Sequence, residues 1–142
     1  MSVRSEKVRL AIDAKLNVSN VTDAATGGVH YMVAPKGTPK PYVVFQRVPG
    51  VVDRAFAETN TGERDLWMVK AVVDEDSSDT TGPATLAETI LAACETAIGT
   101  SLTITGGTVA RCVRKNDMQF SLQDESDRQA WTFGFYLETY AE

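Results

Sequence analysis

The chain has 142 residues, a length that favours a single domain spanning residues 1–142. Its 14 Lys and Arg residues against 19 Asp and Glu residues give a formal charge of −5, so we expect no sequence-specific binding of nucleic acid. No apolar run is long enough to cross a membrane, and residues 1–7 do not resemble a signal peptide. We therefore expect a folded, soluble protein of the cytoplasm, and the two cysteines are too few for a disulfide framework.

The first half of the chain predicts one helix and two strands. Apolar residues recur at helical spacing over residues 3–16, which indicates a helix, and the polar, glycine-rich segment 17–28 reads as a connection. A short strand is predicted over 29–33. Three prolines then force a turn, and a clear β run spans 42–48.

The segment 49–64 predicts a long loop, because it contains Pro49-Gly50, Asn60-Thr61-Gly62 and charges of both signs. A loop of this length in a small domain usually has a function. We therefore expect a mobile arm, in the free protein, that contacts a partner. Its candidate contact residues are Asp53, Arg54, Phe56, Glu58, Glu63 and Arg64.

The second half of the chain predicts a strand at 64–73 and then a helix that begins at Pro83 and ends at Gly99. Two strands follow, at 101–104 and 108–114. A polar link at 115–127, with a possible short strand at 118–122, leads to a closing strand at 131–140. The closing strand alternates clearly. One face carries Trp131, Phe133, Phe135 and Leu137, which we expect to pack against the second helix.

The order of elements lacks the regular strand–helix alternation of a parallel, doubly wound sheet. It predicts the α+β class instead, with a mainly antiparallel sheet of about five strands and two helices packed on one face.

A search for catalytic patterns finds no phosphate-binding loop, dinucleotide fingerprint, zinc helix or nucleophile elbow. A nucleophilic pair of Cys94 and His30 is formally possible, but Cys94 lies on the apolar stripe of the second helix, where a thiol is packing. The acidic segment 74–79 could offer oxygen ligands to a cation, yet it lacks the spacing of a calcium loop. We predict no catalytic, cofactor or metal site.

The run Ala34-Pro35-Lys36-Gly37-Thr38-Pro39-Lys40-Pro41-Tyr42-Val43-Val44-Phe45-Gln46 resembles a family of small proteins encoded in the tail gene clusters of long-tailed bacteriophages and prophages. These are the tail terminator, or tail-completion, proteins. The resemblance covers nearly the whole chain, because the predicted elements occur in the order that the family shows. The chain departs from many relatives in segments 49–64 and 115–128.

The resemblance implies a structural role in virion assembly, with a ring of usually six subunits on the head-proximal end of the tail tube. Such a ring stops tube growth and provides the surface for head joining. The implied partners are copies of the chain itself, the major tail tube protein and a head-completion or neck protein. Assembly would take place in the host cytoplasm and leave the protein at the head–tail junction of the virion.

Subunit contacts in such a ring are expected at sheet edges or at the faces near 42–48 and 64–70. The candidate interface residues are Tyr42, Gln46, Arg47 and Lys70. Two alternatives remain open at this point. The chain could be a head–tail connector or neck protein, or a small α+β enzyme or ligand-binding domain that uses Cys94, His30 or the acidic segment.

Overall fold

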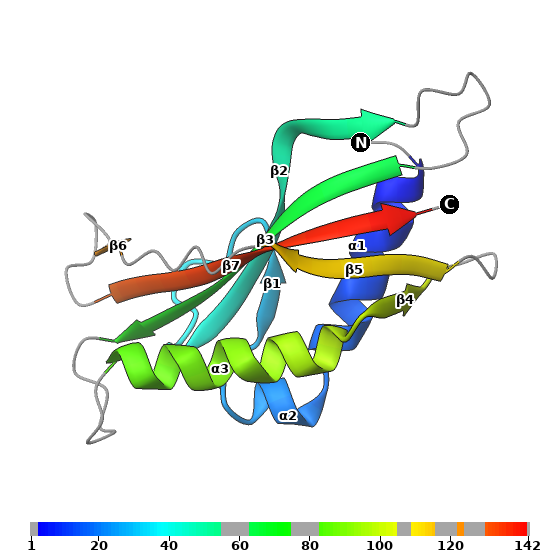
Figure 1. Cartoon of the computed structure of the whole chain (residues 1–142). Coiled ribbons are helices and arrows are strands. Elements are labelled where there is room, and N and C mark those ends of the chain that lie inside the picture. The colour runs from blue at the N-terminus through cyan, green and yellow to red at the C-terminus, as the bar shows by residue number, and fades with distance from the viewer. Residues whose placement is uncertain are drawn as a thin grey trace.

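The computed structural model describes residues 3–54, 63–74, 83–104, 109–115, 122–123 and 130–141. The predicted α+β class is confirmed. The elements, in chain order, are α1 (Val3–Leu16), α2 (Ser19–Thr22), β1 (Val29–Tyr31), β2 (Tyr42–Arg54), β3 (Glu63–Asp74), α3 (Pro83–Ile98), β4 (Ser101–Thr103), β5 (Val109–Lys115), β6 (Leu122–Gln123) and β7 (Ala130–Ala141) (Figure 1).

All strands of the described chain belong to one mainly antiparallel sheet. The strand order is β1-β2-β3-β7-β5-β4, and β6 pairs with β7 beside this path. Only β1 and β2 are parallel among these pairs. The seven strands exceed the expected five because β1, β4 and β6, each of two or three residues, pair with longer strands.

Both long helices lie on the same side of the twisted sheet (Figure 1), and the core fills the space between. From α1, Val8, Ile12 and Leu16 are fully buried at intervals of four residues. The sheet contributes the largest buried side chains, Phe45 of β2, Trp67 of β3 and Phe135 of β7, and α3 contributes Ala87, Ile90, Leu91, Cys94 and Ile98.

Both predicted helices are confirmed, but the connection between α1 and β1 is more structured than we expected. Gly99 follows α3 with φ +68°, the left-handed conformation that glycine adopts without strain. Within segment 17–28, the carbonyl of Val18 accepts hydrogen bonds from the N–H groups of Val21 and Thr22, which forms the single turn α2. Val21 is fully buried, so tertiary packing stabilises a turn that its polar sequence does not predict.

The predicted loop at 49–64 is wrong at both of its ends, because β2 continues to Arg54 and β3 begins at Glu63. The ladder shifts register between Arg47 and Val52, and this bulge accommodates the Pro49-Gly50 pair that reads as a strand break. Figure 1 shows β2 bending sharply there. Residues 55–62, including the rest of the predicted loop, lie outside the described residues.

Beyond the bulge, the ladder continues with Asp53 opposite Arg64 and Arg54 opposite Glu63. Residues of opposite charge directly across an antiparallel pair favour that register. The same charges that indicate an exposed loop in the sequence are therefore compatible with a strand pair.

The alternation predicted for the closing strand is confirmed. Phe135 and Leu137 of β7 are buried on the helix side, whereas Trp131 and Phe133 pack against the core while remaining half-buried. Of the possible strand at 118–122, the structure describes Leu122 alone, which belongs to β6 and pairs with Thr132. Residues 116–121 lie outside the described part of the chain.

Candidate interaction surface

The side of the sheet opposite α1 and α3 carries no helix of the described chain, and we call it the open face. The register of the strands defines it, because side chains alternate between the two sides. Most of its side chains are half-buried, and Val44, Val72 and Glu138 are buried. Its members on β1, β2, β3 and β7 include His30, Tyr42, Val44, Gln46, Leu66, Met68, Lys70, Val72, Thr132, Gly134, Tyr136, Glu138 and Tyr140.

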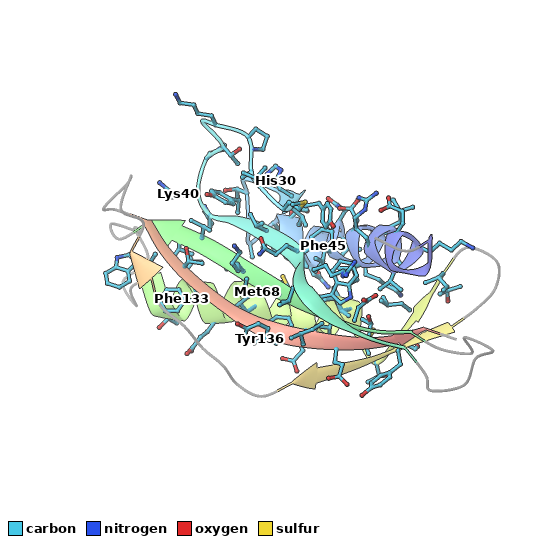
Figure 2. The ribbon with its side chains drawn as sticks, turned by 90° about the horizontal axis from the view of Figure 1, so that it is seen from above. His30, Lys40, Phe45, Met68, Phe133 and Tyr136 are labelled. Atoms are coloured by element: carbon cyan, nitrogen blue, oxygen red, sulfur yellow. The ribbon has the colours of Figure 1, made fainter. Side chains whose placement is uncertain are left out.

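Two rows of residues cross the centre of the open face. In the first row, Met68 of β3 lies directly between Gln46 of β2 and Tyr136 of β7. In Figure 2, Met68 and Tyr136 lie together along β3 and β7, while Phe45 lies next to α1. In the second row, Lys70 lies between two residues without charge, Val44 and Gly134. The centre of these two rows is thus apolar and aromatic apart from Lys70, and the first row continues to Lys115 of β5, which lies opposite Tyr136.

Lys70 has no ion-pair partner among the described residues. Partial burial lowers the pKa of its ammonium group, because the charged form has lost part of its hydration. Glu138 lies on the same face but four residues beyond Gly134 along β7, which is about 13 Å at strand spacing. The Glu138 carboxylate instead accepts a hydrogen bond from the hydroxyl of Tyr140.

The structure separates the four predicted interface residues into two groups. Tyr42, Gln46 and Lys70 lie on the open face, whereas Arg47 lies on the helix side. The guanidinium Nε of Arg47 is 3.6 Å from Oδ1 of Asp65, a carboxylate that is 97% buried. Arg47 is therefore part of a mostly internal ion pair, and its side chain is less available for a subunit contact than the sequence suggests.

The ion pair of Arg47 and Asp65 adjoins a second buried polar contact. Trp67, the next residue of β3 on the helix side, donates a hydrogen bond from Nε1 to the Oγ1 of Thr139 at 2.9 Å. Both polar contacts lie at the end of the sheet where β2 bends. No motif in the sequence links Trp67 to Thr139, which is 72 residues away, so sequence reasoning could not find this contact.

The predicted partner-contacting residues divide in a similar way. Asp53, Arg54, Glu63 and Arg64 occupy the terminal part of the β2–β3 ladder, and they are therefore strand residues. Phe56 and Glu58 lie outside the described residues. What the structure adds is a strand framework that brings these four charged positions together at one end of the sheet.

A second exposed feature, which the sequence analysis missed, follows β1. The carbonyl of Tyr31 accepts a hydrogen bond from the N–H of Val33 at 2.8 Å, and Met32 between them has φ +67°. This tight turn is uncommon and strained for a non-glycine residue. It leaves Met32 61% exposed and Val33 75% exposed. The only signal in the sequence is that two large apolar residues precede a proline-rich segment.

The proline-rich segment that carries the family resemblance is fixed to the start of β1. The N–H of Gly27 donates a hydrogen bond to the carbonyl of Pro41 at 2.8 Å. A side chain at position 27 would not fit, since its Cβ would lie 1.9 Å from the carbonyl oxygen of Pro39.

The structure does not bring Cys94 and His30 together. Cys94 is in the core, on the helix side of the sheet, and burial raises the pKa of its thiol to about 12. His30 lies on the open face, where its Nε2 is 2.9 Å from the carbonyl oxygen of Gly27. The acidic segment 74–79 lies almost entirely outside the described residues. Within those residues, no group of three or more His, Cys, Asp or Glu could hold a metal ion.

No protein-family model and no curated protein sequence matches this chain. Solved structures do match its fold. A chain from the virion of the native gene transfer agent particle aligns over 100% of this chain and 99% of its own length, with a TM-score of 0.73 at 17% identity. A second solved structure aligns over 99% of this chain and 97% of its own length, with a TM-score of 0.62 at 16% identity.

These two likenesses extend from end to end in both chains, so the shared fold includes all the layers of this domain. At this level of identity, similar positions need not carry similar residues, and the comparisons bear on the fold alone. Among the described helices, none is long and apolar enough to span a membrane.

Proposed function

We propose that the chain is a structural subunit of a phage-like particle, and more specifically a tail terminator. In this role it forms a ring, usually of six subunits, on the head-proximal end of the tail tube and stops the growth of the tube. The end-to-end likeness to a chain of the gene transfer agent virion is the observation that supports this proposal most strongly. The sequence resemblance at residues 34–46 adds support from a different kind of observation.

A ring subunit needs two different surfaces, because each copy contacts the next in a head-to-tail manner. The open face is a suitable first surface, and it carries Tyr42, Gln46 and Lys70. Such a role is structural and involves no cofactor and no chemical step. We therefore propose that the chain is not an enzyme.

For the remaining partners, we propose the major tail tube protein and a head-completion or neck protein. The charged end of the β2–β3 ladder, with Asp53, Arg54, Glu63 and Arg64, is the proposed contact for one of them. The ring would assemble in the host cytoplasm and remain at the head–tail junction of the finished particle.

The proposal is tested by measuring the assembly of the purified chain, alone and with isolated tail tubes. We expect closed rings in native mass spectrometry and negative-stain images, either free or on one end of each tube. A chain that remains monomeric in solution and on the tubes would overturn the ring. A chain that binds isolated heads but not tubes would replace the terminator role with that of a neck connector.

A lysate test addresses termination itself. Particles made without this protein should have overlong tails or unattached heads, and the wild-type chain supplied in trans should restore normal tails. Normal tail length and infectivity without the protein would contradict the proposed role.

A further inference from the structure

Lys70 of the open face, which has no ion-pair partner among the described residues, has a complementary surface on the opposite side of the same molecule. Helix α3 buries one side in the core and exposes Thr85, Glu88, Thr89, Ala92, Glu95 and Thr96 on the other. Glu88, Ala92 and Glu95 are spaced so that they share the outer face of the helix. The 16 residues of α3 include no lysine or arginine, so both charged residues among these exposed positions, Glu88 and Glu95, are acidic.

We propose that α3 of one subunit packs on the open face of the next, with Lys70 facing Glu88 of the neighbouring copy. The inference rests on the proposed function, because it names the contact by which the ring closes. It adds a second copy of the chain as the occupant of the open face and identifies the charged pair that sets the register.

The first reason is the arrangement of layers. The domain has helices on one side of its sheet and none of the described helices on the other. A helix from a second copy would cover the half-buried Met68 and Tyr136, which present apolar and aromatic area at the centre of the open face. Since the two contacting surfaces are different, the contact is heterologous, as a ring requires.

The second reason is charge. The chain carries a net charge of −5, so two copies repel each other overall and need a specific attraction at their contact. Lys70 provides a positive group at the centre of the open face, flanked by uncharged Val44 and Gly134. The α3 surface provides the exposed carboxylate of Glu88, and the helix itself contains no lysine or arginine that would repel Lys70 of the neighbouring copy.

Charge reversal provides the test. We expect Lys70→Glu and Glu88→Lys each to weaken self-association at least about tenfold, since each change places like charges in contact. The double variant that carries both substitutions should assemble like the wild-type chain. A control reversal at an exposed residue that belongs to neither surface, Lys36→Glu, should leave assembly unchanged.

A mixture of the two single variants gives a sharper result. The Glu88→Lys chain keeps an intact open face, and the Lys70→Glu chain keeps an intact α3 surface. Every contact between unlike variants therefore pairs a lysine with a glutamate, whereas every contact between copies of one variant pairs like charges. Sedimentation velocity should show the wild-type assembly in the equimolar mixture, with the two variants alternating, whereas each variant alone should be a monomer.

The outcomes separate this inference from the proposed function. If the wild-type chain forms rings and the Lys70→Glu chain forms the same rings, the inferred contact is wrong and the ring stands. If the mixture assembles but both it and the wild-type chain grow into open filaments, the contact stands and the terminator ring is wrong. A mixture of two folded variants, verified by circular dichroism, that stays monomeric overturns the inference.

Discussion

The two faces of one sheet differ in almost every respect, although they are built from the same strands. On the helix side of β7, Phe135 is 1% exposed and packs with α1 and α3, whereas its neighbour Tyr136 on the open face is half-buried and has no covering helix among the described residues. Each face also carries a cation that can be compared, Arg47 near the end of the sheet and Lys70 near its centre. Arg47 on the covered face faces Asp65, while Lys70 on the open face has no carboxylate partner within the described chain.

This difference separates stability from interaction. Residues on the covered face should determine whether the domain folds, because they supply the buried apolar area. Residues on the open face should affect stability little and assembly strongly. Matched substitutions on the two faces test that division.

The largest effect is expected for Phe135→Ala, which removes a fully buried ring from the core. It should lower the free energy of unfolding by about 3–5 kcal/mol, whereas Tyr136→Ala on the opposite face should cost about 1 kcal/mol because no cavity forms. Denaturant unfolding of the two variants measures both values. Equal losses would show that the open face is covered in the free subunit.

The next effect concerns the ion pair of the covered face. Arg47→Met should lower the free energy of unfolding by about 2–3 kcal/mol, because it removes the guanidinium that lies 3.6 Å from the buried Asp65 carboxylate. The Arg47 side chain is 19% exposed, so we expect less than for a fully buried pair. Combining Arg47→Met with Asp65→Leu should recover part of the loss. A double variant whose loss is the sum of the two single losses would contradict a direct interaction.

A smaller effect is expected for Thr139→Val, which keeps the shape of the side chain and removes the acceptor of the Trp67 indole N–H. The unsatisfied donor should cost about 1–2 kcal/mol. The change should also shift the fluorescence of Trp67, and comparison with a Trp131→Phe background isolates that signal. An unchanged spectrum and stability would mean that the hydrogen bond contributes nothing measurable.

The sequence predicts the covered face better than the open one, for a physical reason. Apolar periodicity reports which side chains leave water, so it correctly identifies α1, α3 and the inward residues of β7. It carries less information where a strand is only partly buried. Pro49 and Gly50 read as a loop because the sequence does not show that a bulge accommodates them opposite β3.

The candidate surface shows the same limit. Tyr42, Gln46 and Lys70 lie on the face that the two long helices leave open, but Arg47 has the same polar character in sequence and points to the other side. Alternation along β2 separates Gln46 from Arg47, yet only the structure shows which side is covered. The strained turn at Met32 depends on a backbone conformation that no residue type in that segment predicts.

The smallest effect, and the one of opposite sign, is expected at the cation of the open face. Lys70→Met should raise the free energy of unfolding of the isolated subunit by a few tenths of a kcal/mol, roughly, because it removes a partly desolvated charge that has no partner among the described residues. Arg47→Met, the matched change on the covered face, should have the opposite sign.

The difference in stability between the wild-type chain and Lys70→Met should depend on pH. Because the pKa of Lys70 is lowered in the folded state, the unfolded chain binds more protons between the lowered pKa and the ordinary value of 10.5. As the pH rises through this interval, the free energy of unfolding of the wild-type chain should therefore increase relative to that of Lys70→Met. Above the interval the two values should be equal. Urea unfolding of both proteins in parallel at neutral and alkaline pH measures the difference, and both contain the same cysteines, whose ionisation then cancels. A Lys70→Met variant that is less stable than the wild-type chain at neutral pH would show that Lys70 already has a partner within its own subunit, which would remove the charge argument for a second copy.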